Sequence, residues 1–348
     1  MNDTSTSRPS GSNPAQESGS SASGRAVARQ PTIGLALGGG GARGLAHILM
    51  LEVLDEMGVK PKVIAGTSIG AIFGAAYASG YTATQIRAHT EELLRSRFEI
   101  LRQFFSARQE PLGRVMSVFQ LRSALLNAEA LVNIIMPPRL ARDFEELSIP
   151  FSAIAADFYT QDQVVLSCGD LKSAVAASMA LPVLFSPVLS DEHALMDGGL
   201  VNPLPFDVIT GQCDVMVAIN VSGAGRLTQE RTPPKATEAV IGSLQILQNT
   251  IVREKLASRQ PDVLIDVDVG HFQVLDFHKL EQVLHAAEPA KDLLRQKLER
   301  VLTAETLEAE TVVEPAKPDN LAKKTPELEE PPPAKRARLA QRLLSNRP

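Results

Sequence analysis

The sequence predicts an α/β protein with a mainly parallel central sheet, and three observations lead to this prediction. Short apolar runs bounded by glycine or proline alternate with segments whose apolar residues recur at helical spacing. The first four segments follow in the order strand, helix, strand, helix, with short connections between them. No internal repeat interrupts this order. Such an order favours parallel pairing of the strands and a doubly wound sheet.

The first four elements can be placed residue by residue. The run TIGLAL at 32–37 precedes a group of glycines and predicts a buried strand. Apolar residues at helical spacing over 45–57 predict a helix, which Gly58 ends as a left-handed cap. The runs at 62–65 and 69–80 predict a second strand and a second helix.

The rest of the chain continues the alternation of strands and helices. A short strand is expected to end at Asp197, and Pro289 marks a position where the last helix could break. Further strands are expected at 151–156, 163–167, 215–221 and 262–269, and further helices at 171–180, about 236–259 and about 278–302.

Composition divides the chain into one domain and two tails. Residues 1–30 are rich in Ser, Gly, Asn, Pro and Thr, and residues 303–348 are rich in Glu, Pro and Lys. Neither stretch can bury enough apolar surface to offset its ordering entropy, so both are expected to be disordered. Residues 31–302 are expected to form one large domain, within which 83–148 is a variable, helical, lid-like insert.

Charge and cysteine content exclude several classes of protein. The formal net charge is −5, so the protein is not expected to bind nucleic acid. Cys168 and Cys213 lie in different expected elements, which favours a reducing compartment over a disulfide framework. The N-terminal residues lack the apolar segment of a secretory signal, and no run of eighteen apolar residues occurs. We therefore expect a cytoplasmic protein.

The insert contains an apolar stripe flanked by arginines. Leu94, Phe98, Leu101 and Phe105 recur at helical spacing. Three interpretations remain open: ordinary packing of an amphipathic helix, a lid over an apolar site, or a basic surface that touches anionic lipid.

The glycine run in GGGGARGLAH (38–47) raises the question of what its backbone amides face. The spacing Gly39-x-Gly41-x-x-Gly44 matches a dinucleotide-binding fingerprint, but that fingerprint needs an acidic residue at the end of the next strand. The next strand ends in Gly66-Thr67-Ser68, which offers no carboxylate, and the run lacks the Gly-Lys of a phosphate-binding P-loop. Nucleotide binding is therefore disfavoured.

The second strand instead leads into a G-x-S-x-G motif, Gly66-Thr67-Ser68-Ile69-Gly70. Between a strand and a helix, such a motif places the serine on a sharp turn with its hydroxyl exposed above the sheet. If Ser68 attacks an ester carbonyl, the carbonyl oxygen becomes negative and needs preorganised donors. Amides of a glycine-rich loop at a helix start supply such donors. A turn with no chemistry is the alternative.

A serine nucleophile needs a base, and the sequence offers histidines and one aspartate. A Ser–Asp–His order requires a late histidine, but His271, His278 and His285 carry no local motif. His47 lies on the polar face of the first helix and His89 in the insert, and an ordinary structural role is the alternative for each histidine. Asp197 in ALMDGGLVNPLPF lies on a tight turn after a strand, although Asp-Gly is also a common turn dipeptide.

These motifs together resemble those of a known family. GGGGARG, GTSIG and DGG, in this order, are similar to the three signature motifs of the patatin-like phospholipases, and SAVAASMALPVLFSPV agrees with their usual connecting sequence. The resemblance covers about residues 32–302 and is weakest over 83–148. It implies a three-layer α/β/α sandwich and a serine lipid acyl hydrolase that forms an acyl-enzyme, acts on lipid esters and uses no metal or cofactor.

The resemblance also assigns roles to residues. It makes Ser68 the nucleophile and Asp197 the base of a dyad that contains no histidine. The matching oxyanion-hole element comprises Gly39, Gly40, Gly41 and Arg43, and the supporting motif glycines are Gly44, Gly66, Gly70, Gly198 and Gly199. Because the ordinary pKa of aspartate is about 3.9, Asp197 can serve as a base only in direct contact with Ser68 in a partly shielded site.

Two further points stay open on the sequence alone. A regulatory protein that keeps this fold but acts by binding is the main alternative to an enzyme. The C-terminal basic residues are compatible with weak contact with an anionic membrane, at about 1 kcal/mol per charge, but a solvated tail without a role is the favoured interpretation. These basic residues are Lys335, Arg336, Arg338, Arg342 and Arg347. The sequence gives no prediction of oligomeric state.

Overall fold

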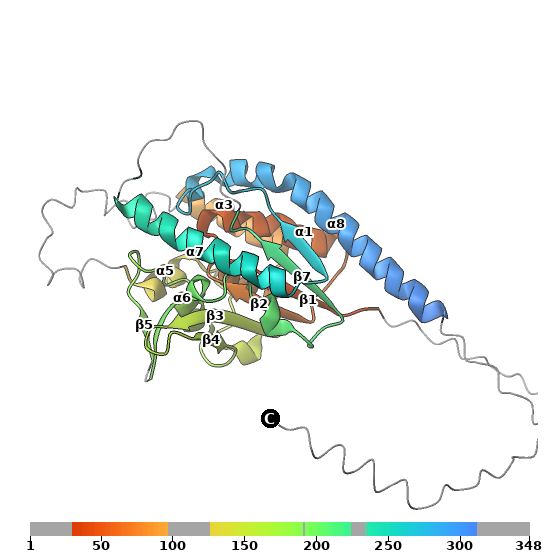
Figure 1. The fold of residues 1–348 in the computed structure, drawn as a ribbon, viewed down its shortest axis with the longest axis horizontal. Coiled ribbons are helices and arrows are strands. Elements are labelled where there is room, and N and C mark those ends of the chain that lie inside the picture. The colour runs from red at the N-terminus through yellow and green to blue at the C-terminus, as the bar shows by residue number, and fades with distance from the viewer. Residues whose placement is uncertain (1–29, 97–125, 191, 224–233, 235, 312–348) are drawn as a thin grey trace, which may run out of the picture. The chain divides into compact units, whose positions relative to one another are not determined.

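The structure, a computed structural model, describes residues 30–96, 126–190, 192–223, 234 and 236–311 (Figure 1). One compact unit extends to Glu310 and contains all the strands described below. A second unit begins at Thr311, and its other residues lie outside the described part of the chain. Phe98, Leu101 and Phe105 of the arginine-flanked stripe, and the basic C-terminal residues, also lie outside it.

The centre of the fold is one mainly parallel sheet. Its strands are β1 (Ile33–Leu37), β2 (Val63–Thr67), β3 (Phe151–Asp157), β4 (Gln163–Leu166), β5 (Val188–Leu189), β6 (Ala194–Asp197), β7 (Val215–Asn220) and β8 (Val263–Asp266). They lie in the order β5-β6-β3-β2-β1-β7-β8, with β4 also paired to β3. The pairs from β3 through β2, β1 and β7 to β8 are parallel, whereas β4, β5 and β6 form antiparallel pairs. The predicted mainly parallel sheet is confirmed.

The strand register brings the sequence motifs to one level of the sheet. Leu37 at the end of β1 pairs with Gly66 of β2, so the glycine run and the serine motif leave neighbouring strands side by side. On the other side of β2, Thr67 pairs with Ile154 of β3, and the next residue of β3, Ala155, pairs with Asp197 of β6. Ser68 and Asp197 therefore come together across the end of β3.

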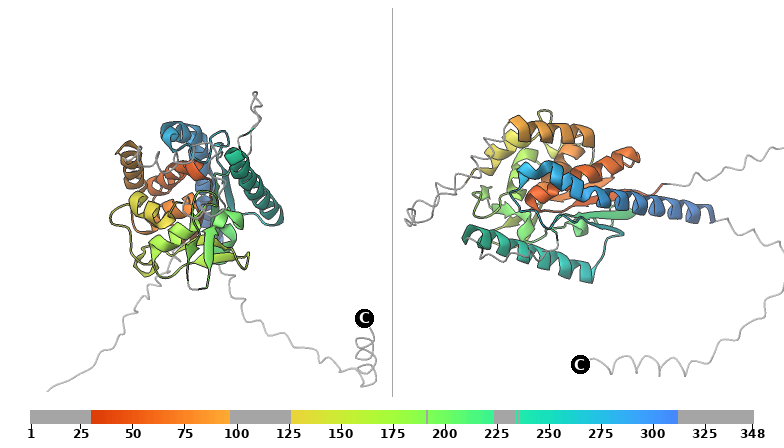
Figure 2. Two further views of the ribbon diagram at one scale, coloured as in Figure 1. Left: turned by 90° about the vertical axis from the view of Figure 1, so that its left-hand side faces the viewer. Right: turned by 90° about the horizontal axis from the view of Figure 1, so that it is seen from above.

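Helices cover both faces of the sheet, as the edge-on view in Figure 2 shows. They are α1 (His47–Glu56), α2 (Ile69–Ala78), α3 (Ala83–Ser96), α5 (Ala128–Ile135), α6 (Leu171–Ser178), α7 (Ala236–Ser258) and α8 (Leu280–Thr311). α1, α2, α6 and α8 pack on one face, α3 packs against α1, and α5 packs against α6. α7 lies on the opposite face. The result is the three-layer α/β/α arrangement that the resemblance implies.

Two hydrophobic cores follow from the alternation of side chains along the strands. In β1, Leu35 and Leu37 point into the larger core beneath α1 and α2, whereas Ala36 points into the smaller core beneath α7. The smaller core is completed by Phe206 and by Val252 of α7. Since both faces of a parallel strand are buried, its sequence is a continuous apolar run rather than an alternating one, as TIGLAL is.

The structure differs from the predicted elements in three places. The first helix begins with a short 3₁₀ turn, Gly41–Ala46, before α1, and Gly58 ends α1 with φ of 66° as expected. β8 ends at Asp266, well before the expected end at 269. α8 continues through Pro289 to Thr311, so residues 303–311, expected in the tail, lie in this helix. No helix in the described ranges is both long and apolar enough to cross a membrane.

Candidate active site

Ser68 lies on a strained turn between β2 and α2. Its φ of 55° and ψ of −120° belong to a region that residues other than glycine rarely adopt, at a cost of about 1–3 kcal/mol. The turn is this sharp because α2 approaches the sheet closely: a Cβ on Gly70 would overlap the carbonyl oxygen of Leu37. This geometry is that of a nucleophile elbow, which presents the serine hydroxyl above the sheet.

The other supporting glycines share this close packing. A Cβ on Gly66 would overlap the backbone of Gly70, and one on Gly198 would overlap the carbonyl of Ile154. A side chain would meet a neighbouring heavy atom in the same way at Gly44, against Ile69, and at Gly199, against Gln248. The close approach of backbone segments therefore requires glycine at 66, 70 and 198, whereas at 44 and 199 the neighbouring atoms belong to side chains.

Asp197 contacts the serine directly. Its Oδ2 accepts a hydrogen bond of 2.6 Å from the Ser68 hydroxyl, and its Oδ1 accepts one of 2.7 Å from the amide of Gly199. The side chain is only 2 % exposed. Burial raises the pKa of Asp197 to about 6, outweighing the two hydrogen bonds that lower it. The carboxylate is thus a better proton acceptor than an aspartate in water.

The glycine run passes beside the serine, and its amides differ in availability. A Cβ on Gly39 would lie 3.5 Å from the Cβ of Ser68. The amide of Gly39, however, donates to the carbonyl of Pro203 at 2.9 Å, so Gly39 is not a free donor as the resemblance had implied. The amides of Gly40 and Gly41 make no hydrogen bond to the described part of the chain. Their role as oxyanion donors stays a prediction.

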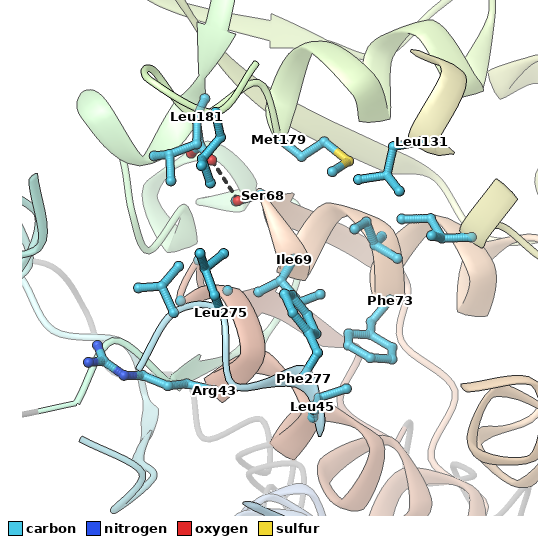
Figure 3. Close-up of a pocket in the computed structure, with 18 of the residues that line it drawn as sticks. Arg43, Leu45, Ser68, Ile69, Phe73, Leu131, Met179, Leu181, Leu275 and Phe277 are labelled. Atoms are coloured by element: carbon cyan, nitrogen blue, oxygen red, sulfur yellow. Dashed lines mark hydrogen bonds between the residues drawn. The ribbon is translucent and has the colours of Figure 1, made fainter. Parts of the chain in front are cut away.

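The Arg43 guanidinium is turned away from Ser68 (Figure 3). Its Nε donates to the carbonyl of Phe272 at 2.8 Å, and one terminal nitrogen donates to the carbonyl of Ser222 at 2.6 Å. The residue is 8 % exposed. Arg43 therefore ties the helix start after the glycine run to the segments that follow β7 and β8. The membership of Arg43 in the oxyanion-hole element stays a prediction.

A cavity of about 150 Å³ joins the expected site residues. Ser68, Asp197, Arg43 and the glycines 39–41 all lie in its wall. The rest of the wall is mainly aliphatic and aromatic and comes from α2, α3, α5, α7, the segment after α6 and the segment before α8. Figure 3 labels Phe73, Leu131, Met179, Leu181 and Phe277 of this wall. Its other members include Ile72, Leu93, Leu184, Ile241 and Leu244. Such a surface excludes water and accommodates an apolar chain.

The histidines take other positions than a catalytic triad requires. Among the described residues, the Ser68 hydroxyl bonds to Asp197 and to no histidine. His89 lines the cavity but bonds to the carbonyl of Ile135 at 2.8 Å, and His278 lies in a 3₁₀ turn rather than in α8. No group of three or more His, Cys, Asp or Glu in the described ranges is arranged to hold a metal ion.

His47 is fully buried, whereas the sequence placed it on a polar helix face. Its Nε2 lies 2.9 Å from the carbonyl oxygen of Gly38, and its ring packs edge-on against Phe73. Burial lowers the pKa of His47 to about 4, so the ring is neutral near pH 7. Because a carbonyl only accepts, Nε2 must carry the proton. His47 thus donates a hydrogen bond to the carbonyl of Gly38, the first glycine of the run, and holds it in place.

Two polar contacts behind the serine were not found from the sequence. The amide of Ser68 donates to Oγ of Ser178 at 3.0 Å, and the hydroxyl of Thr67 donates to the carbonyl of Asn202 at 2.8 Å. Both partners are more than a hundred residues away along the chain. They lie in the stretches SAVAASMALPVLFSPV and ALMDGGLVNPLPF, but nothing in these stretches indicates that the two residues contact the turn at Ser68.

Comparison with protein families gives one match. The model of a family described as "Patatin-like phospholipase" matches residues 35–210, about half of the chain, and this range includes the glycine run, Ser68 and Asp197.

Curated relatives come from bacteria and animals. An uncharacterized NTE family protein of Mycobacterium tuberculosis is 31% identical over 304 residues, which are 80% of this chain and 48% of the relative. The mouse patatin-like phospholipase domain-containing protein 6 is 33% identical over 277 residues, 72% of this chain and 20% of the relative. The chain thus spans about half the length of the mycobacterial relative and a fifth of the mouse protein.

Two solved structures are similar at low sequence identity. VipD from Legionella pneumophila has a TM-score of 0.41 at 14% identity, with 77% of this chain and 67% of VipD covered. ExoU of the Pseudomonas aeruginosa type III secretion system, in complex with SpcU, has a TM-score of 0.38 at 16% identity, with 79% and 53% covered.

Proposed function

Because the chain belongs to the patatin-like phospholipase family, we propose that it is a serine lipid acyl hydrolase that cleaves acyl esters of phospholipids or related lipids. One observation carries the proposal: the 2.6 Å hydrogen bond from Ser68 to a buried carboxylate of Asp197, at the wall of an apolar cavity. A nucleophile in contact with a base of raised pKa is suited to acyl transfer, and the apolar wall is suited to a fatty acyl chain.

In the proposed mechanism, Oγ of Ser68 attacks the ester carbonyl carbon while its proton passes to Oδ2 of Asp197. The carbonyl oxygen becomes an oxyanion and accepts hydrogen bonds from the amides of Gly40 and Gly41. The tetrahedral intermediate then expels the alcohol, which takes the proton from Asp197. A water molecule attacks the acyl-Ser68 ester in the same way, with Asp197 again as base, and releases the fatty acid.

The proposal is tested by measuring products with two kinds of substrate. The purified protein is incubated with vesicles of phosphatidylcholine, with micelles of lysophosphatidylcholine and with a soluble short-chain acyl ester, and free fatty acid or alcohol is quantified. We expect turnover of the soluble ester and of at least one lipid. No turnover of any of the three would overturn the proposal and favour a binding protein with this fold.

The hydrolysis rate should depend on pH through Asp197. Only the ionised carboxylate accepts the proton of Ser68, so kcat/KM for an uncharged ester should be full above about pH 7 and fall as pH decreases through about 6. His47, with a pKa lowered to about 4, stays neutral over this range and adds no second transition. The measurement is a pH profile from 4.5 to 8.5. A rate that stays at its plateau value down to pH 5 would contradict the raised pKa.

Replacement of Arg43 should destabilise the packing of the glycine run against the segments after β7 and β8, and should not remove a contact with the phosphate group of a substrate. Arg43→Met removes two buried, charge-assisted hydrogen bonds, so we expect the free energy of unfolding to fall by about 3 kcal/mol. Hydrolysis of phosphatidylcholine and of the uncharged ester should decrease by the same factor. Arg139→Met, at an exposed position, serves as the control. A loss confined to the phosphate-bearing substrate would instead assign Arg43 to substrate binding.

A further inference from the structure

The end of α6 holds both members of the dyad. The amide of Ser68 donates to Oγ of Ser178 at 3.0 Å, and the amide of Asp197 donates to the carbonyl of Ala180 at 3.1 Å. Ser178 is the last residue of α6, and Ala180 follows two positions later. Two residues that are far apart in the sequence thus take their backbone positions from one three-residue stretch, 178–180.

Ser68 needs such support because its backbone is in the left-handed region with φ of 55°. It is the N-cap of α2, so its own amide precedes the helix and has no carbonyl of α2 to bond to. The Ser178 hydroxyl is the acceptor that this amide uses. If that acceptor is removed, a partly buried amide loses its partner and the turn has less to hold it in a strained conformation.

Ser178 does not touch the cavity. It is fully buried and is absent from the cavity wall, whereas its neighbours Met179 and Leu181 contribute to that wall. An effect of Ser178 on catalysis must therefore pass through Ser68 rather than through contact with substrate.

We propose that Ser178 is a positioning residue for the nucleophile. Its hydroxyl fixes the amide of Ser68, while the carbonyl of Ala180 fixes the amide of Asp197, and together they set the distance between the serine hydroxyl and the carboxylate. The proposal rests on the function of the dyad proposed above. It assigns a role in the reaction to a residue outside the three signature motifs.

Ser178→Ala should lower kcat by about 10- to 100-fold, because a small misplacement of a reacting group is costly in rate. KM should stay within about twofold, because the cavity wall is unchanged. A displaced Ser68 hydroxyl weakens a hydrogen bond that lowers the pKa of Asp197, so the apparent pKa in the pH profile should move upward and not downward.

Two further variants separate the hydrogen bond from packing. Ser178→Cys keeps a side chain of similar shape but accepts hydrogen bonds weakly, so it should also lower kcat. Ser173→Ala makes the same chemical change on the same helix, at a partly buried residue whose hydroxyl bonds to Glu129 rather than to the dyad, and should leave kcat unchanged.

The experiment measures kcat and KM with a soluble acyl ester and the rate constant of labelling by a fluorophosphonate, with rates normalised to the number of sites that label at saturation. We expect kcat and the labelling rate constant to fall together in Ser178→Ala and Ser178→Cys, with unchanged KM. If Ser178→Ala or Ser178→Cys keeps the wild-type kcat and labelling rate constant per labelled site, the inference is overturned. It is also overturned if Ser173→Ala lowers kcat as much as Ser178→Ala does. A wild-type protein that neither labels nor hydrolyses the ester would instead overturn the proposed function.

Discussion

Replacing Ser68 by alanine is expected to reduce ester hydrolysis by about four to six orders of magnitude, to the background rate. The hydroxyl is the only nucleophile that the described residues place against Asp197 at the cavity wall. Without it, no acyl-enzyme forms, and the remaining oxyanion donors give little rate by themselves. The measurement is the hydrolysis rate of a soluble ester at pH 8 with protein of verified mass.

The fold should survive this change. Alanine removes one partly exposed oxygen, and it also leaves Asp197 with one hydrogen bond fewer. Ser79→Ala, just after the other end of α2, is a matched control because its hydroxyl bonds only to backbone groups of Ala75 and Ala141. This control should retain activity. Hydrolysis by Ser68→Ala above a few per cent of the wild-type rate would contradict the assignment of the nucleophile.

Asp197→Asn should be nearly as damaging, with a loss of about 10⁴-fold in kcat. An amide has the shape of the carboxylate and can keep both contacts, accepting from Gly199 and donating to Ser68, but it cannot take up the serine proton. The same measurement applied to alanine variants of His271, His278 and His285 should show substantial activity in each. If one of these three variants folds but is inactive, a triad rather than a dyad operates.

The same substitution should make the protein more stable at neutral pH. A carboxyl whose pKa is raised to about 6 by burial binds its proton more tightly in the folded state than in the unfolded chain, so ionisation destabilises the fold. The rise from 3.8 corresponds to about 3 kcal/mol at ~1.36 kcal/mol per pKa unit. The contribution of Asp197 to wild-type stability should therefore decrease as pH rises from about 4 to 6. The buried His47, whose pKa is lowered to about 4, acts in the opposite direction in both proteins, so the effect of Asp197 is the difference between wild type and Asp197→Asn.

Urea unfolding of wild type and Asp197→Asn at pH 4 and pH 8 measures this effect. The difference in free energy of unfolding between the two proteins should shift in favour of the variant by about 3 kcal/mol on going from pH 4 to pH 8. A shift in the opposite direction would mean that Asp197 is stabilised as an anion in the fold, which would weaken it as a base.

The parts of the site that local pattern defines could be predicted from the sequence. The strand 32–37, the second strand and the helix after Ser68 are recognisable because glycines and prolines bound short apolar runs. The elbow at Ser68 follows from the G-x-S-x-G spacing between a strand and a helix. Asp197, by contrast, could be matched to Ser68 only by family resemblance. The two residues meet because β6 pairs with β3 in a particular register, and no local sequence pattern specifies that register.

The contacts that depend on tertiary packing could not be predicted. His47 follows a helical pattern that places it outward, yet the glycine run folds back over it and buries it. Ser178 bonds to an amide 110 residues away. α8 passes through Pro289 because Ala287, Ala290 and Leu294 are buried along it, and this packing outweighs the break that proline favours. The amide of Gly39 likewise donates to the carbonyl of Pro203, a contact that the sequence around either residue does not indicate.

The most direct test of the central claim is the site of covalent modification by a fluorophosphonate. The reagent mimics the ester carbonyl and stays attached to the serine that attacks it. Peptide mapping of the labelled protein should find one adduct per chain, on Ser68, with none in Ser68→Ala and slow formation in Asp197→Asn. An adduct on another residue, or an unlabelled protein that still hydrolyses the ester, would contradict a Ser68–Asp197 dyad.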